Sequence, residues 1–151
     1  MEKERDIDAL AGERWFPKES SSEDDMKELW GDWGVCSEVE KLKDVLMHRP
    51  GKEIENFDWR AARFRDEIDP EKFRAQHDAL ADVYRSHGAR VHYVEDVPAN
   101  RPNALFCRDL VFMTPEGAIV TRPATESRRG EERYAAKKLA ELGVPIIRTV
   151  C

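Results

Sequence analysis

The chain has 151 residues, of which 40% are apolar, with 31 acidic side chains against 25 Lys and Arg. A chain of this length can bury roughly 68 to 70% of its unfolded surface, so one core can form without metals or disulfides. It contains no apolar run near the roughly 20 residues of a membrane-spanning helix and no N-terminal signal peptide, so we expect neither membrane insertion nor secretion. Most of the net charge of −6 falls in residues 1–30, and the near-neutral remainder has no basic stripe, which argues against a nucleic-acid partner.

Residues 1–34 are predicted to form a flexible acidic leader, because the Ser-rich, acidic stretch at 20–25 lacks sustained periodicity. The aromatic side chains of this leader would be costly to expose, so we expect it to lie as an arm over an apolar edge of the core. They are Trp15, Phe16, Trp30 and Trp33. The folded domain is then expected over residues 35–151.

A strand, a helix and a second strand are predicted next. The first strand lies within residues 39–48, where an apolar run is stopped by a Pro-Gly turn. The helix begins at Asp69, a capping residue followed by proline and glutamate, and ends at Gly88. Its apolar face is expected to contain Phe73, His77, Leu80 and Tyr84. The second strand covers residues 90–94.

A hairpin is predicted after a Pro- and Asn-rich loop at 96–104. Its strands are expected over residues 106–113 and 118–122, on either side of a Pro-Glu-Gly turn. Thr125 or Ser127 is then expected to cap a helix with the apolar stripe Ala135, Leu139 and Leu142. Gly143 ends this helix, and a last strand is predicted over residues 144–150.

The two helices share one design. Each is followed by a glycine cap and a parallel-type strand, and the caps, Gly88 and Gly143, are 55 residues apart. This repetition favours an α/β repeat architecture in which each unit buries only part of its core, although an ordinary mixed α/β sandwich is the alternative. Two units are too few to close a repeat fold, so we expect the chain to be incomplete.

The histidines and cysteines show no catalytic or metal-binding spacing. None of the four histidines belongs to an H-x-x-x-H or H-E-x-x-H pattern. The three cysteines form no C-x-x-C pair, which fits a reducing cytoplasm better than a disulfide framework or a zinc site. Cys107 is expected to be a buried thiol within a strand, and nothing beside Cys151 indicates an activated one.

Residues 102–109 (PNALFCRD) bring an amide, an aromatic ring, a guanidinium and a carboxylate together after a loop, as binding sites often do. Asp109 could bind a planar cation through paired hydrogen bonds while Phe106 stacks on the face of that cation. The alternative is a structural ion pair between Asp109 and Arg108 or another nearby charge.

Three segments resemble the N-terminal part of the guanidino-group-modifying superfamily, in the right order. They are residues 45–53 (VLMHRPGKE), 102–109 with the pattern F-x-R-D, and 128–132 (RRGEE). The superfamily contains arginine deiminases, dimethylarginine dimethylaminohydrolases and amidinotransferases. Its fold, the pentein, is an α/β propeller of five ββαβ-type units, so residues 35–151 are expected to form a partial pentein of about two units.

The resemblance also implies roles for individual residues. Asp109 falls on the active-site carboxylate that binds the substrate guanidinium, and Phe106 on the aromatic residue of the motif. Asn103 and Arg128 fall where groups that hold the substrate's α-carboxylate are expected. The implied ligand is arginine or a related small guanidino compound, and no metal or organic cofactor is implied.

The implied mechanism is attack by a cysteine thiolate on the guanidinium carbon, with a histidine as proton carrier, followed by resolution with water or an amine acceptor. No segment here matches those that carry the catalytic Cys and His, so we expect this chain alone to be inactive, and to self-associate or need a completing chain.

Two alternatives to an enzyme or enzyme fragment are open. One is a non-catalytic guanidino-binding or interaction module, and the other is an unrelated small α/β regulatory domain.

Overall fold

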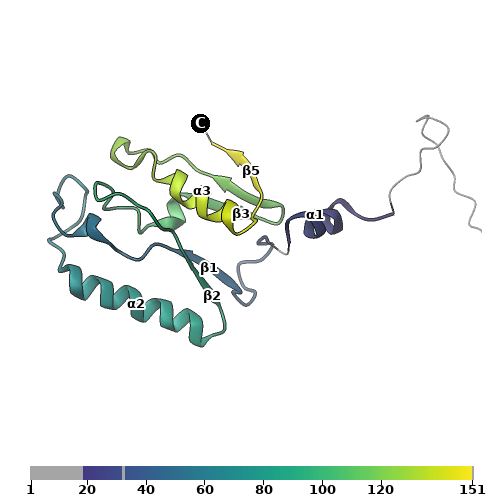
Figure 1. Cartoon of the computed structure of the whole chain (residues 1–151), viewed down its shortest axis with the longest axis horizontal. Helices are drawn as coiled ribbons and strands as arrows, with labels where there is room; N and C mark the ends of the chain where they lie inside the picture. Colours follow the sequence, from purple (N-terminus) through teal and green to yellow (C-terminus); the bar gives the residue numbers. More distant parts are fainter. Residues whose placement is uncertain (1–18, 32, 151) are drawn as a thin grey trace, which may run out of the picture.

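The computed structural model describes residues 19–31 and 33–150 and shows a mixed α/β architecture (Figure 1). The helices and strands are, in chain order, α1 (Ser22–Trp30), β1 (Asp44–Met47), α2 (Pro70–Ser86), β2 (Arg90–Tyr93), β3 (Val111–Thr114), β4 (Gly117–Val120), α3 (Glu132–Glu141) and β5 (Ile146–Thr149). Short 3-10 turns cover Lys52–Ile54, Cys107–Asp109 and Glu126–Arg128. None of the described helices is long and apolar enough to cross a membrane.

The first unit is β1-α2-β2, and its two strands pair in parallel from Asp44↔Arg90 to Met47↔Tyr93. The predicted helix is confirmed, and Asp69 caps it by accepting hydrogen bonds from the backbone N–H groups of residues 71 and 72. Its inward face differs from the prediction at one position. Ala81 is fully buried, whereas Leu80 lies at the edge of the face and is 46% exposed.

The second unit is β3-β4-α3-β5. Strands β3 and β4 form the predicted antiparallel hairpin, and β5 pairs with β4 in parallel. The hairpin's first strand begins at Val111 rather than Phe106, because residues 107–109 form a 3-10 turn in which the Asp109 N–H donates to the Phe106 carbonyl at 3.1 Å. The prediction of a strand around Cys107 was therefore wrong.

The start of α3 also differs from the prediction. The helix begins at Glu132, and Thr125 instead precedes the 3-10 turn Glu126–Arg128 without a capping hydrogen bond from its side chain. Ser127 lies inside that turn and does not cap α3. The turn places Arg128 beside the hairpin entrance rather than on the helix.

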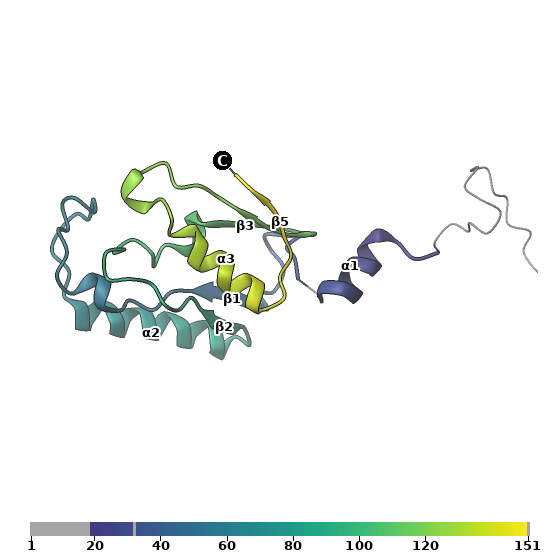
Figure 2. The same ribbon diagram turned by 45° about the horizontal axis from the view of Figure 1, so that its top comes forward.

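One apolar interior joins the two units, although they do not share a sheet. The strands form a two-stranded sheet, β1-β2, and a three-stranded sheet, β3-β4-β5. Leu46 of β1 and Val111 of β3 pack against both clusters of buried residues, and Ala135 of α3 is completely buried. Figures 1 and 2 both show α3 between the strands of its own sheet and the β1-β2 pair.

The N-terminal segment contains a helix that the sequence analysis did not predict. α1 is capped by Ser21, whose hydroxyl accepts from the Asp24 N–H at 3.1 Å, and it lies to the side of the body (Figure 1). Trp33 packs against the second apolar cluster and makes an edge contact with the ring of His92. Trp15 and Phe16 lie outside the described residues.

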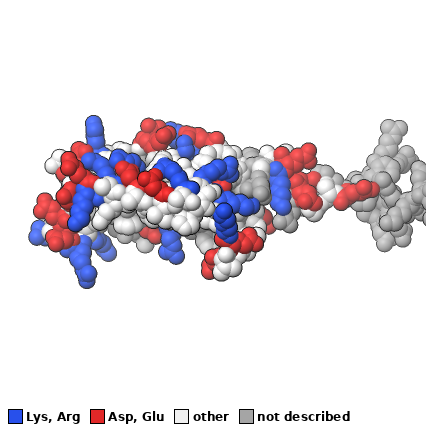
Figure 3. All heavy atoms as spheres, turned by 90° about the horizontal axis from the view of Figure 1, so that it is seen from below, with Lys and Arg blue, Asp and Glu red and all other residues white. Residues whose placement is uncertain are grey.

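Acidic and basic side chains are interspersed on the face shown in Figure 3. The body also contains exposed ion pairs, such as that of Arg49 with Asp78 of α2 at 2.7 Å. This face of the body therefore offers no single-sign surface of the kind that nucleic acids need.

Candidate functional site

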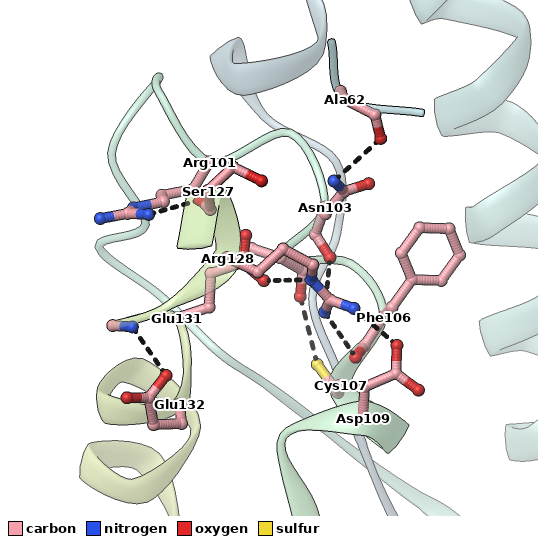
Figure 4. A network of polar contacts seen from close by, with 12 residues as sticks. Ala62, Arg101, Asn103, Phe106, Cys107, Asp109, Ser127, Arg128, Glu131 and Glu132 are labelled. Carbon is pink, nitrogen blue, oxygen red and sulfur yellow. Dashed lines mark hydrogen bonds and ion pairs between the residues drawn. The ribbon is translucent and has the colours of Figure 1, made fainter. Parts of the chain in front are cut away.

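A pocket of about 290 Å³ lies between the 3-10 turns Cys107–Asp109 and Glu126–Arg128 and the loop that precedes α2. Its walls are formed by Ala62, Arg63, Asn103, Phe106, Asp109, Thr125, Ser127 and Arg128. The structure thus brings together the four residues selected from the sequence, Asn103, Phe106, Asp109 and Arg128, and Figure 4 shows the first three around the Arg128 guanidinium.

Asp109 stands at the end of its 3-10 turn with half of its side chain exposed. One carboxylate oxygen, Oδ2, accepts a hydrogen bond from Nη1 of Arg128 at 2.7 Å. The carbonyl oxygen of the same residue accepts from the hydroxyl of Thr121, which anchors the turn to the end of β4. The backbone is therefore fixed while the carboxylate faces the pocket. The alternative expected for Asp109, an ion pair with a nearby charge, is thus present, with Arg128 rather than Arg108 as the partner.

Arg128 is mostly buried, and each nitrogen of its guanidinium has a protein acceptor. Nε donates to Glu131 at 2.8 Å, Nη1 donates to Asp109, and Nη2 lies 3.3 and 3.5 Å from the carbonyl oxygens of Asn103 and Phe106. The Cζ atom is 5.8 Å from the centre of the Phe106 ring. Burial alone would lower the pKa of Arg128, but the hydrogen bonds to the two carboxylates outweigh it and raise the pKa.

Glu131 is the buried partner of Arg128, and only 1% of its surface is exposed. Burial raises the pKa of this carboxyl group, and the hydrogen bond and charge of Arg128 oppose that rise only in part. Its second oxygen, Oε1, has no hydrogen-bond partner among the described residues. No role was expected for Glu131 from the sequence, although its i,i+3 spacing from Arg128 is typical of an ion pair.

The loop before α2 contributes a wall that the sequence did not reveal. Nδ2 of Asn103 donates to the carbonyl oxygen of Ala62 at 3.1 Å, and the ring of Phe64 lies 6.2 Å from that of Phe106. These contacts bring Arg63 to the pocket in a left-handed backbone conformation, with φ of 63°. No motif marks this residue, because its contacts join segments about 40 residues apart.

The described cysteines and histidines lie elsewhere. Cys107 is buried behind the pocket, and burial raises the pKa of its thiol to about 12. Cys36 and His92 line a separate pocket of about 280 Å³, which Trp33 also lines. Among the described residues, no group of three or more His, Cys, Asp or Glu side chains could hold a metal ion.

The pocket combines an exposed acceptor for a cation with two guanidinium groups. Two carboxylates, Asp109 and Glu131, face the guanidinium of Arg128, and Arg63 is a second cation in the pocket lining. The half-exposed carboxylate and the Phe106 ring border the open part of the pocket. A planar cation is the ligand that such groups bind best.

The family model for N,N-dimethylarginine dimethylhydrolase, eukaryotic, matches residues 45–146. The chain belongs to this family. The resemblance to the guanidino-group-modifying superfamily is thereby confirmed, and the matched range contains all four selected side chains of the pocket.

The curated relatives that this chain matches include arginine deiminases. The chain is 44% identical over 68 residues to the enzyme of Streptococcus uberis, covering 43% of this chain and 17% of the relative. It is 46% identical over 68 residues to that of Streptococcus pyogenes, covering 43% and 16%. The match thus spans about a sixth of the length of these relatives.

Two solved structures of dimethylarginine dimethylaminohydrolase show the fold. A cysteine-to-serine variant from Pseudomonas aeruginosa, complexed with citrulline, has a TM-score of 0.57 at 23% identity, covering 72% of this chain and 42% of that one. An adduct with 4-chloro-2-hydroxymethylpyridine has a TM-score of 0.56 at 23% identity, covering 71% and 40%. The mixed α/β fold of this chain is therefore that of part of a pentein protein.

Proposed function

We propose that the chain supplies the guanidinium-binding part of the site of a hydrolase that acts on arginine or a related guanidino compound. The observation that carries the proposal is the convergence of Asn103, Phe106, Asp109 and Arg128 on one pocket. These residues come from two segments, and their meeting places a carboxylate, an aromatic ring and a buried guanidinium within reach of one small ligand.

Each residue has a role in this proposal. Asp109 accepts hydrogen bonds from the ligand's guanidinium, and Phe106 covers one face of that planar group. Arg128 and the amide of Asn103 hold the α-carboxylate at the other end. The pocket volume of about 290 Å³ is near the lower end of the usual range for small-molecule sites, which suits a single amino acid.

The proposed reaction requires groups that the described part of this pocket does not contain. A cysteine thiolate attacks the guanidinium carbon, ammonia or an amine leaves with a proton from a histidine, and water or an amine resolves the amidino-enzyme. We propose that other units of a larger pentein supply these groups, and that residues 35–151 form about two of its five units while residues 1–34 form an arm. Coverage of about two fifths of the structural neighbours supports this division.

The proposal is tested by ligand binding. Isothermal titration of the 151-residue chain with arginine and with dimethylarginine should show binding that Asp109→Asn weakens at least tenfold, since a charge-assisted pair is lost. Asp78→Asn is the matched control, because it also removes a half-exposed carboxylate that pairs with an arginine but lies on α2, away from the pocket. Equal weakening by both substitutions, or none by either, would contradict the proposal.

A non-catalytic guanidino-binding module is the second candidate. It is favoured by the pocket lining, in which no histidine or cysteine is found among the described residues. Both candidates require Asp109-dependent binding. They differ in the result of one assay, in which the remaining units of a pentein fold are added to this chain. The enzyme should then form citrulline from arginine, and the binding module should form none.

A further inference from the structure

The separate pocket of about 280 Å³, called the second pocket below, opens onto the apolar interior of the second unit. Two half-exposed apolar side chains also line it, Val35 and Leu42, each 47% exposed. Accessible apolar surface with a polar rim is typical of a place where another group packs. Six of the lining residues belong to the second apolar cluster or pack against it, namely Trp33, Leu46, Met113, Leu139, Leu142 and Val144.

The carboxylate and the imidazole in the lining are already engaged within the protein. Asp44 accepts a hydrogen bond from Nε2 of His92 at 2.7 Å and another from Nη2 of Arg90 at 2.8 Å. The ring of His92 also makes an edge contact with the ring of Trp33. The second pocket therefore offers an occupant mainly apolar contact, which suits an aromatic or aliphatic group better than a charged one.

The arm, residues 1–34, meets the body at this pocket and has further aromatic residues to bury. Trp33 at its end packs against the second apolar cluster, and the Val35 N–H donates to the Thr114 carbonyl oxygen of β3 at 3.2 Å. One contact between the arm and this apolar surface is thus already in place. Trp15 and Phe16 are the other large aromatic pair of the arm, and rings of this size are costly to leave in water.

The chain between the aromatic pair and Trp33 is long enough to fold back. α1 leads away from the body in Figures 1 and 2, and its nine residues span about 13.5 Å. The six Cα–Cα steps from Phe16 to Ser22 reach up to about 20 Å, which exceeds the length of the helix. The described chain already bends at residues 19 and 20, where such a reversal is needed.

We propose that Trp15 and Phe16 dock in the second pocket of their own chain, so that the arm closes the apolar interior of the second unit. Pro17 restricts Phe16 to extended conformations, which lowers the entropy that the pair loses on docking. The docking involves no residue of the pocket around Asp109, so it is independent of the function proposed above.

The thiol of Cys36 reports whether the second pocket is covered, because Cys36 is exposed and lines it. The 151-residue chain is treated with iodoacetamide, and alkylation of Cys36 is followed by mass spectrometry. The double substitution Trp15→Ala with Phe16→Ala should speed this alkylation about fivefold or more, because the pocket then stays open. Leu29→Ala is the matched control, since it removes an apolar side chain that is 74% exposed on α1, and it should leave the rate unchanged.

A substitution in the lining tests the same contact from the other side. Leu42→Glu should also speed alkylation of Cys36, because a charge there opposes the docking of an aromatic ring. The added negative charge by itself disfavours the thiolate, so it cannot account for a faster rate. Val39→Glu is the matched control, at a side chain that is 93% exposed and outside the lining, and it should change nothing. Leu42→Glu should add no further effect to the double aromatic substitution, because both remove one contact.

A peptide of residues 11–19, added to the double aromatic variant, should slow the alkylation of Cys36 again, and a peptide with both aromatic residues replaced by alanine should not. Wild-type and double-variant rates that are equal, or an equal effect of Leu29→Ala, would overturn the proposal. An effect that disappears on dilution would place the aromatic pair in the pocket of a second copy, and docking within one chain would then be wrong.

Discussion

The carboxylate of Asp109 and the guanidinium of Arg128 lie 2.7 Å apart, but the two side chains are 50% and 14% exposed. The contact therefore joins a buried cation, held from behind by Glu131, to an anion at the pocket surface. When the Asp109 contact is lost, Arg128 keeps the buried Glu131 as its partner at 2.8 Å. Loss of the half-exposed carboxylate should therefore have a limited effect on the fold.

Asp109→Asn should consequently impair function much more than stability. In a protein with the complete site, we expect kcat/KM for the guanidino substrate to fall about a hundredfold or more, since the amide keeps the shape but cannot hold the cation against the nucleophile. The melting temperature should change little. Steady-state kinetics and thermal unfolding of the same preparation check both statements. A near-normal rate with a clearly lowered melting temperature would make Asp109 a structural ion-pair partner.

The elements with strong local signals could be predicted from the sequence. Asp69 and the proline after it define the start of α2, and Gly88 and Gly143 follow the two long helices. The helix α1 was missed because its cap at Ser21 is not followed by an apolar periodicity. The 3-10 turn at residues 107–109 was missed because apolar residues on both sides of it, at 105–106 and 110–111, fit a strand, and only the i+3 backbone hydrogen bonds distinguish the two.

The candidate site was predictable only in part, because several of its contacts join segments far apart in the sequence. The motif around Asp109 is contiguous, so it could be recognised as a unit. Its contact with Arg128 spans 19 residues, and the contact of Asn103 with Ala62 spans 41. Such contacts depend on how turns are placed in space, which neither periodicity nor local spacing determines. The role of Glu131 depends on burial in the same way.

The 151-residue chain alone should produce no citrulline from arginine. The reaction needs a thiolate next to the guanidinium carbon. Among the described residues, no cysteine lines the pocket of Asp109, and the buried Cys107 thiol, with its pKa raised to about 12, stays protonated at neutral pH. A colorimetric citrulline assay with an arginine deiminase as positive control is the measurement. Turnover above background would show that a nucleophile is present after all.

The stability of the fold should depend on pH through His48 and Glu53. Nδ1 of His48 lies 3.0 Å from the Val94 carbonyl oxygen and Nε2 lies 3.1 Å from Oε1 of Glu53. Both partners can accept, so both contacts are satisfied together when the ring is protonated and each ring nitrogen donates. Burial disfavours both charges, but these hydrogen bonds outweigh it, raising the pKa of His48 and lowering that of Glu53.

The sign of the dependence follows from these directions. The contribution of His48 is fully present below its unfolded pKa of 6.5 and is lost as the pH rises through its raised folded pKa. That of Glu53 is present above 4.5 and is lost as the pH falls through its lowered folded pKa. The pair should therefore stabilise the fold most between about pH 4.5 and 6.5.

Urea unfolding of wild type and His48→Gln between pH 5 and 9 tests this expectation. Near pH 6 the substitution should cost about 1 to 3 kcal/mol, because one glutamine cannot satisfy both buried acceptors. The difference between the two proteins should shrink as the pH rises toward 9. His87→Gln, at an exposed histidine that follows α2, is the control and should not show this trend. A difference that is constant over the whole range would mean that His48 acts only through packing.

Self-association of the isolated chain is expected through the edge of the three-stranded sheet. β5 is the outer strand of that sheet, and all four of its residues are exposed. Ile146 and Ile147 on it are 40% and 42% exposed, and Phe112 on β3 is 63% exposed. An open strand edge with apolar side chains is a template for pairing with another chain.

Sedimentation velocity at several concentrations should therefore show a mass that grows with concentration, and Ile147→Lys should shift it toward the monomer. Val39→Lys introduces the same charge at a side chain that is 93% exposed outside this sheet, so it should leave the association unchanged. A monomer at every concentration, or an equal effect of the two lysines, would contradict association through β5.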